Sequence, residues 1–265
     1  MITQVGITGG GGRIGSVLAA SLADKYKLTL FYRKTKPAPS LGLKLVQADL
    51  SDEKQVKDIF DGLDAIIHLA ADPSTRATWE EVLNKNIIAT YNVYEEARRA
   101  GISKIVFAST NHVQHGYTMA ETPSTEDLSY VEQNGLIKLS DPPAPDSLYG
   151  VSKLFGEDLG RYYARLFGIR FVSLRIGSAA PEVVLPWLTK GDKSRRDHLR
   201  VMFLSRRDLV DVFDRALQVE TDFLVAYAVS DNKPCVFDLT ETREKLSYNP
   251  RDNSANYFGE DIKAL

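Results

Sequence analysis

Short apolar runs alternate with longer amphipathic stretches through the first two thirds of the chain. The run 65–69 is almost entirely apolar, which is typical of a parallel strand covered on both faces. Repeated strand–helix–strand units predict a doubly wound parallel sheet, the Rossmann type of α/β fold. The predicted strands are 5–8, 28–32, 43–47, 65–69, 104–108 and 171–175, and the predicted helices are 14–24, 54–60, 79–100 and 149–167.

Beyond residue 176 the alternation becomes irregular, with a helix predicted at 205–219 and a short strand at 226–229. The sequence shows neither a linker nor an internal repeat in this part. We therefore expect one domain over residues 1–265, in which 177–265 contribute most of a small C-terminal lobe that covers the substrate. The polar segment 250–265 is expected to fray.

Composition and charge exclude several classes of function. The 33 Lys and Arg residues nearly balance the 35 Asp and Glu residues, so no overall positive field favours nucleic acid. The single cysteine, Cys235, is flanked by apolar residues and is expected to be a buried thiol. No apolar run is long enough to span a membrane, and the N-terminus lacks the features of a signal peptide. We expect a cytoplasmic protein that binds neither nucleic acid nor membrane.

A glycine-rich turn follows the first predicted strand and opens the first predicted helix. Its spacing satisfies both GxGxxG, at Gly10, Gly12 and Gly15, and GxxGxxG, starting at Gly9. Glycines let the backbone approach a pyrophosphate closely, and the helix N-terminus offers N–H groups to the phosphates. A ligand-free glycine turn is the alternative, and the flanking strand and helix argue against it. The sequence therefore predicts an NAD(P) site.

The end of the second predicted strand is expected to contact the adenosine ribose. It carries Arg33 and Lys34 where an NAD enzyme usually has a carboxylate. Two cations suit a 2′-phosphate, so the pair favours NADP, with NAD possible; a solvated charge pair is the alternative. Asp49, followed by Leu50, is expected near the adenine amino group, or else as a helix N-cap.

Tyr149 and Lys153 lie four positions apart at the start of a predicted helix, and therefore on one face of it. An ammonium beside a phenol favours the phenolate and lowers its pKa, which makes tyrosine a usable general base. The segment 107–112 places hydroxyl and amide side chains at the carboxyl end of a parallel strand, where open α/β sheets bind ligands. Together these features predict a catalytic site.

The ordered set of motifs resembles the extended short-chain dehydrogenase/reductase family. Within it, the chain is most similar to the uronate dehydrogenases and related sugar and sugar-phosphate dehydrogenases. The short C-terminal part fits this group better than the nucleotide-sugar epimerases. The motifs that carry the resemblance are TGGGGRIG (8–15), HLAA (68–71), NIIATYN (86–92), FASTNH (107–112), YGVSK (149–153) and RIGS (175–178).

The resemblance implies a role for each matching residue. Tyr149 would take the proton of a sugar hydroxyl, Lys153 would hold the nicotinamide ribose, Thr110 would orient the hydroxyl and Asn86 would support the lysine. Hydride would leave the anomeric carbon, giving a lactone without a metal ion. The implied substrate contacts are Ser109, Asn111, His112 and Ser178, and the cofactor contacts are Gly9, Gly12, Arg13, Ile14, Gly15, Arg33, Lys34, Asp49, Leu50, Leu69, Ala70, Ala71, Lys153 and Ile176.

One segment departs from the uronate dehydrogenase pattern. That group holds the substrate carboxylate with an arginine in the loop after RIGSxxPE, and here the loop is longer. Arg195, Arg196 and Arg200 are all available in 189–200, and such a cluster could bind a carboxylate or a phosphate. We assign Arg200 to the substrate; a solvated basic loop is the alternative.

Two other functions share these motifs. A nucleotide-sugar epimerase or dehydratase would need a tightly retained NAD and a larger lobe. A dinucleotide-binding sensor would have no need of a proton acceptor such as Tyr149. The resemblance also implies a homo-oligomer formed through helices such as the one that carries Tyr149.

Overall fold

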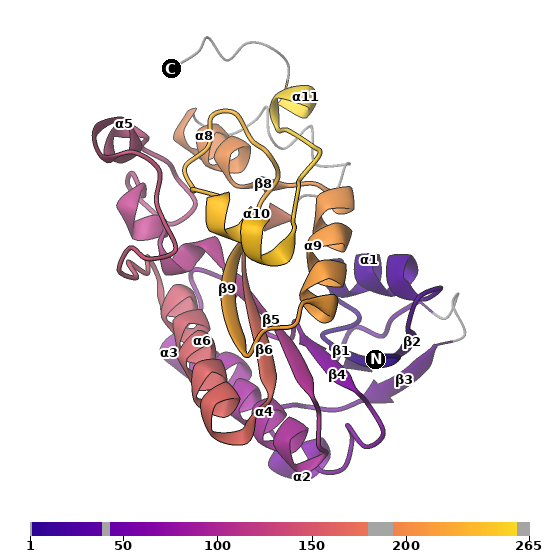
Figure 1. Ribbon diagram of the computed structural model, residues 1–265. Coiled ribbons are helices and arrows are strands. Elements are labelled where there is room, and N and C mark those ends of the chain that lie inside the picture. Colours follow the sequence, from indigo (N-terminus) through magenta and orange to yellow (C-terminus); the bar gives the residue numbers. More distant parts are fainter. Residues whose placement is uncertain (1, 39–42, 180–192, 259–265) are drawn as a thin grey trace.

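The computed structural model of the protein describes residues 2–38, 43–179 and 193–258. Its centre is a seven-stranded sheet in the order β3-β2-β1-β4-β5-β6-β9, with every neighbouring pair parallel (Figure 1). This confirms the predicted doubly wound sheet. The strands are β1 Gln4–Thr8, β2 Lys27–Tyr32, β3 Lys44–Gln47, β4 Ala65–His68, β5 Lys104–Thr110, β6 Arg170–Ile176 and β9 Phe223–Ala228.

The direction of winding reverses at β1, which lies between β2 and β4. In such sheets the crevice at the carboxyl ends of the strands on either side of the reversal binds the ligand. The register brings Thr8 of β1 beside His68 of β4, and Ser109 of β5 beside Arg175 of β6. Polar groups from widely separated parts of the chain therefore meet at one edge of the sheet.

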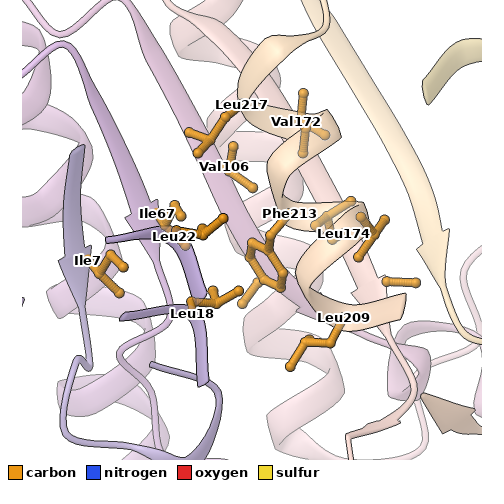
Figure 2. Close-up of a cluster of buried hydrophobic side chains, with 14 of the residues drawn as sticks. Ile7, Leu18, Leu22, Ile67, Val106, Val172, Leu174, Leu209, Phe213 and Leu217 are labelled. Atoms are coloured by element: carbon orange, nitrogen blue, oxygen red, sulfur yellow. The ribbon is translucent and has the colours of Figure 1, made fainter. Parts of the chain in front are cut away.

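Helices cover both faces of the sheet (Figure 1). On one face, α1 Arg13–Leu22 and α9 Arg206–Gln218 pack together, and α4 Ala89–Arg99 and α6 Leu148–Phe167 cover the other. Burying a leucine or phenylalanine side chain contributes about 1.5–3 kcal/mol, so these layers hold the strand ends in place. Figure 2 shows the layer formed by α1 and α9. Its side chains Leu18, Leu22, Leu209, Phe213 and Leu217 pack against Ile7, Ile67, Val106, Val172 and Leu174 of the strands.

Two predicted helices differ from the structure. The helix expected at 54–60 is only the short α2 Glu53–Val56, because Lys57 leaves helical geometry and Asp58 has a positive φ of 62°. The helix expected at 79–100 consists of α3 Trp79–Val82, a π-helical turn η2 Leu83–Ile88 and α4. π-Helical turns recur at functional sites, and this one carries Asn86.

The C-terminal lobe, in the upper part of Figure 1, packs on the end of β9 through an apolar cluster that includes Met202, Phe237 and Tyr227 of that strand. Residues between β5 and α6 join it, since Ile137 forms an isolated bridge with Phe237. The remaining described elements are η3 Asn111–Val113, η4 His115–Tyr117, α5 Ser129–Asn134, β7 Ser178–Ala179 paired with β8 Phe203–Leu204, α8 Lys193–Val201, α10 Thr240–Leu246 and α11 Ala255–Phe258.

Three expectations about this part of the chain need correction. Cys235 is exposed, because its neighbours Val236 and Phe237 take the buried positions. Residues 193–200, expected in a basic loop, form most of α8, while 189–192 lie outside the described residues. Residues 251–252 do not fray, because their N–H groups donate to the buried Asp208. The end of the polar segment, 259–265, lies outside the described residues.

Among the described residues, no helix combines the length and the apolar character needed to cross a bilayer.

Candidate active site

The turn between β1 and α1 can be built only with glycine at several positions. Gly9 has a φ of +68°, and its carbonyl accepts a hydrogen bond from Gly12 N at 2.9 Å. A Cβ at Gly11 would lie 1.8 Å from the carbonyl oxygen of Thr35, and one at Gly15 would lie 2.5 Å from that of Gly9. No side chain caps α1, so its N-terminal N–H groups and positive dipole end suit a pyrophosphate.

A cavity of about 830 Å³ runs from this turn to the start of α6. Its wall contains every predicted site residue except Asn86 and Arg200. Residues from β5, β6 and α6 and from the loops that follow β1, β2 and β4 thus meet at one edge of the sheet. The predicted residues in the wall are Gly9, Gly12, Arg13, Ile14, Gly15, Arg33, Lys34, Asp49, Leu50, Leu69, Ala70, Ala71, Ser109, Thr110, Asn111, His112, Tyr149, Lys153, Ile176 and Ser178.

The start of α6 places the tyrosine and the lysine. Ser147 caps the helix by accepting a hydrogen bond from Gly150 N at 3.2 Å, so Tyr149 stands in the first turn. Lys153 follows one turn later, and its Nζ lies 5.8 Å from the centre of the Tyr149 ring. The same Nζ donates to the backbone oxygen of Ala108 at 2.7 Å, which fixes it against β5.

The pKa values of this pair differ from the sequence-based expectation. Burial raises the pKa of Tyr149 to about 12, although a hydrogen bond with Thr110 lowers it in part. Burial lowers the pKa of Lys153 to about 7. The predicted lowering of the phenol pKa is therefore wrong for the protein alone, because the loss of solvent, together with the negative charges of Asp146 and Asp72, raises that pKa.

The carboxyl end of β5 supplies the polar wall opposite Tyr149. Thr110 Oγ1 accepts a hydrogen bond from His112 N at 3.3 Å, which caps η3. Asn111 is buried, and among the described residues its Nδ2 has no hydrogen-bond partner. A buried donor without a partner is costly, so a ligand oxygen at this position would stabilise it. Thr110 and Asn111 both line the cavity.

Ser109 contacts a buried ion pair between Glu157 and Arg175, which was not predicted from the sequence. Its Oγ donates to Glu157 Oε1 at 2.5 Å, and Arg175 binds the same carboxylate through two hydrogen bonds of 3.0 and 2.8 Å. Arg175 also donates to Gln114 Oε1 at 2.7 Å. These contacts join β5, β6 and α6 beneath the cavity. In the sequence, these contacts were indicated by Arg175, the first residue of the RIGS motif.

Asn86 is buried behind the cavity wall. Its Oδ1 accepts from Asp72 N at 2.7 Å, and its Nδ2 donates to Asp72 O at 3.1 Å and to Ser152 Oγ at 3.0 Å. The structure therefore links Asn86 to the residue next to Lys153 rather than to the lysine amine. It fixes the loop after β4 against α6.

A second polar contact orders the same loop. Thr8 Oγ1 accepts from the N–H groups of Leu69 and Ala70 at 3.1 and 3.2 Å, and it lies 2.7 Å from His68 Nδ1. Burial lowers the pKa of His68 to about 3, so its ring is neutral. Because Thr8 Oγ1 already accepts two backbone hydrogen bonds, we assign its own proton to Nδ1, which leaves the His68 Nε2–H group to donate to Thr90 Oγ1 at 3.1 Å.

The cations expected at the adenosine ribose lie in the wall at the β2 end of the cavity. Arg33 pairs with Asp49 across 3.6 Å, and both side chains are partly exposed. Hydrogen bonds from Ser51 and the positive charge of Arg33 lower the pKa of Asp49 although burial opposes them. Lys34 lies in the same wall. This end of the cavity thus offers two cations and one carboxylate.

The wall nearest the C-terminal lobe comes partly from α8. Arg195, His198 and Leu199 line the cavity, whereas Arg200 is absent from its wall and pairs with Asp197 at 3.5 Å. Of these two arginines, Arg195 is therefore the one that lines the cavity. Lys85 also lines the cavity and is held by Asp72 at 2.7 Å.

Comparisons with known proteins found a matching family and several similar proteins. The NAD dependent epimerase/dehydratase family matches residues 5–222. The L-arabinose 1-dehydrogenase (NAD(P)(+)) of Haloferax volcanii is 37% identical, over 96% of this chain and 98% of that protein. The NAD-dependent glucose-6-phosphate dehydrogenase of the same organism is 32% identical, over 95% and 94%. A solved structure of a mutated uronate dehydrogenase superposes with a TM-score of 0.81 at 31% identity, over 100% of this chain and 87% of that one.

Proposed function

Because the chain belongs to the NAD dependent epimerase/dehydratase family, we propose that it oxidises a sugar with NAD(P) at the anomeric carbon, giving the lactone. One observation carries the proposal: Tyr149, Lys153 and Thr110 line the same cavity as the glycine turn at α1. The relatives named above act on arabinose, glucose 6-phosphate and uronate. The substrate class is accordingly an aldose, a uronic acid or a hexose phosphate.

The residues at the turn fit a dinucleotide, because no side chain caps the N-terminus of α1 and Gly9, Gly12 and Gly15 line the cavity beside it. NAD(P), when bound, supplies a cationic nicotinamide ring that accepts hydride. Tyr149 Oη takes the proton of the sugar hydroxyl, and Thr110 Oγ1 and Asn111 Nδ2 orient that hydroxyl. Lys153 stands beside the phenol, and its protonated form favours the phenolate.

NADP is the preferred cofactor in this proposal, and NAD is accepted. Arg33 and Lys34 supply two positive charges for a 2′-phosphate at the β2 end of the cavity. Asp49 can accept a hydrogen bond from a ribose or adenine group in the same place. A relative whose printed name specifies NAD(P)(+) is compatible with use of both cofactors.

Arg195, in place of the earlier assignment of Arg200, is our candidate for an anionic substrate group. A carboxylate or phosphate in the cavity would meet its guanidinium on the α8 wall. The lobe that covers the substrate then includes α8 and the segment before α6, within one domain over 1–265.

We also propose that α6 joins copies of the chain into a homo-oligomer. Its outer face exposes apolar side chains that a monomer would leave in water. These are Leu148, Val151, Tyr162, Leu166 and Phe167. Light scattering on the purified protein tests this: a mass of one chain at micromolar concentration would contradict it.

The function is tested by mixing purified protein with NADP or NAD and L-arabinose, D-glucuronate, D-galacturonate or glucose 6-phosphate. Growth of the reduced-nicotinamide absorbance with one of these sugars, and lactone as the product, is the expected result. Protein that binds NAD but forms no net reduced cofactor with any of these sugars would indicate an epimerase or dehydratase. Dinucleotide binding without any turnover would indicate a sensor.

A further inference from the structure

Three of the four histidines in the chain gather in one buried cluster beside the substrate cavity. His112 comes from η3, His115 from η4 and His198 from α8, and Glu126 and Asp146 complete the group. Figure 1 shows α8 in the lobe beyond the ends of the strands. Two carboxylates among imidazoles, away from water, require a positive charge among them. That charge is either a proton or a bound cation.

Three ligand atoms of this cluster form a compact triangle. Glu126 Oε2 lies 3.1 Å from His115 Nε2 and 2.9 Å from His198 Nδ1, and the two nitrogens are 3.2 Å apart. Ligands 2.0–2.1 Å from a tetrahedral zinc ion stand about 3.3 Å from one another, which is close to these separations. The two imidazole nitrogens are also within hydrogen-bond distance of each other, so N–H groups on both of them would point into the same small space.

The other oxygen of this carboxylate gives an independent indication of a ligand. The Glu126 side chain is fully buried, and Oε1 has no hydrogen-bond partner among the described residues. A buried carboxylate oxygen without a partner carries a large desolvation cost. A cation held between Glu126 and the two imidazoles would satisfy it.

Asp146 stands behind the triangle in the position of an outer-shell carboxylate. Its Oδ2 lies 2.6 Å from His115 Nδ1, and its Oδ1 accepts from Ser147 Oγ at 2.7 Å. A proton on Nδ1, held by a carboxylate, leaves the Nε2 lone pair of His115 for a metal, as in carboxylate–histidine–zinc arrangements. His112 shares the same Oδ2 at 2.6 Å, so the alternative group His112–His115–Asp146 is already satisfied by hydrogen bonds.

We propose that His115, Glu126 and His198 bind one divalent transition-metal ion, with Zn²⁺ as the best match to two nitrogens and one carboxylate oxygen. Mg²⁺ and Ca²⁺ prefer all-oxygen sites, so they fit this donor set poorly. The ion ties α8 to the segment between β5 and α5. Because α8 also contributes Arg195, His198 and Leu199 to the cavity wall, the ion holds that wall in place.

The test uses full-length protein without a histidine tag, so that the four native histidines are the only imidazoles. Protein stripped with a chelator and then titrated with zinc sulfate is expected to retain about one Zn²⁺ per chain after gel filtration. Its melting temperature should rise, because a ligand that binds only the folded state stabilises it. Cobalt chloride in place of zinc should give the visible absorbance of a low-symmetry nitrogen-ligated Co²⁺.

Two variants locate the ion, and a third is the matched control. Glu126→Gln and His198→Asn should lose stoichiometric zinc and the cobalt absorbance, while Glu121→Gln, an exposed position in the same segment, should keep both. Circular dichroism of the stripped proteins shows whether each variant folds. The cobalt spectrum of the wild type needs no variant, so it tests the site even if both variants unfold.

Wild-type protein that retains no zinc, or shows only the spectrum of hydrated cobalt, overturns the proposal. Equal zinc retention in folded Glu126→Gln and His198→Asn overturns it too. In either case the positive charge of the cluster is a proton shared among the imidazoles. None of these outcomes depends on which sugar the enzyme oxidises.

Discussion

Lys153 donates a hydrogen bond from Nζ to the backbone oxygen of Ala108 at 2.7 Å. This contact joins α6 to β5 two residues before Thr110, so the lysine and the hydroxyl that orients the substrate share one rigid support. Burial lowers the pKa of Lys153 to about 7, and near neutral pH the amine is therefore present in both protonation states. Lys153 is both an anchor between two elements and a proton-bearing group beside Tyr149.

The burial of Lys153 predicts a pH-dependent stability. The unfolded chain keeps the lysine proton up to the ordinary pKa of 10.5, whereas the folded protein releases it at about 7. Between these values the unfolded state binds more protons, so the penalty of burying the lysine is fully present below pH 7 and disappears as pH rises. The contribution of Lys153 to the free energy of unfolding therefore increases as the pH rises above 7.

The comparison protein is Lys153→Met, which lacks the charge. Urea unfolding should show that the wild type gains free energy of unfolding relative to this variant between about pH 7 and about pH 10. Taking the difference between two proteins removes the contributions of the other titrating groups. A difference that stays constant over this range would mean that the amine is hydrated in the folded state.

Tyr149→Phe should abolish most of the turnover and leave cofactor binding nearly intact. The change removes one oxygen and keeps the ring, so kcat is expected to fall by about 10²–10⁴. The Kd for NADP, measured by fluorescence titration, should change by less than about threefold, since no pyrophosphate contact is lost. Tyr162→Phe, on the exposed face of the same helix, is the control. Undiminished kcat in Tyr149→Phe would remove this residue from the chemistry.

Arg33→Ala should weaken NADP more than NAD. A guanidinium–phosphate hydrogen bond is worth about 1.5–3 kcal/mol, which corresponds to a loss of about tenfold or more in NADP affinity. The variant also frees Asp49 from its partner at 3.6 Å, which favours a ribose with a free 2′-hydroxyl. Arg76→Ala, an exposed arginine that does not line the cavity, serves as control. Equal losses for both cofactors would show that Arg33 does not meet the 2′-phosphate.

Arg195→Ala separates anionic substrates from neutral ones. If Arg195 holds a carboxylate or phosphate, KM for a uronate or hexose phosphate should rise by about tenfold or more, while KM for a neutral aldose changes little. Arg200→Ala is the matched control, because this side chain pairs with Asp197 and is absent from the cavity wall. A larger effect at Arg200 than at Arg195 would restore the original sequence-based assignment.

The sheet could be predicted from the sequence because local patterns decide it. Each parallel strand is a short apolar run, and the glycines at 9–15 have few other uses between a strand and a helix. The placement of Tyr149 and Lys153 is also local, since helix spacing alone puts them on one face. These features needed no knowledge of distant contacts.

The rest depends on contacts between distant segments. Nothing near Glu126 in the sequence indicates that His115 and His198 meet it, and the helix α8 replaced an expected loop. The choice between Arg195 and Arg200 followed only from the orientation of that helix. The raised pKa of Tyr149 could not be predicted for the same reason, because the burial of the phenol is a property of the whole site and not of the YxxxK spacing.

Hydride transfer from the anomeric carbon is tested most directly with a sugar that carries deuterium at C1. The accepted sugar, labelled in this way, is incubated with NADP or NAD and wild-type enzyme, and the reduced cofactor is analysed by mass spectrometry. One deuterium in the reduced nicotinamide ring, with an unlabelled lactone, is the predicted result. Reduced cofactor without deuterium, or a sugar whose configuration changes while no reduced cofactor accumulates, would contradict it.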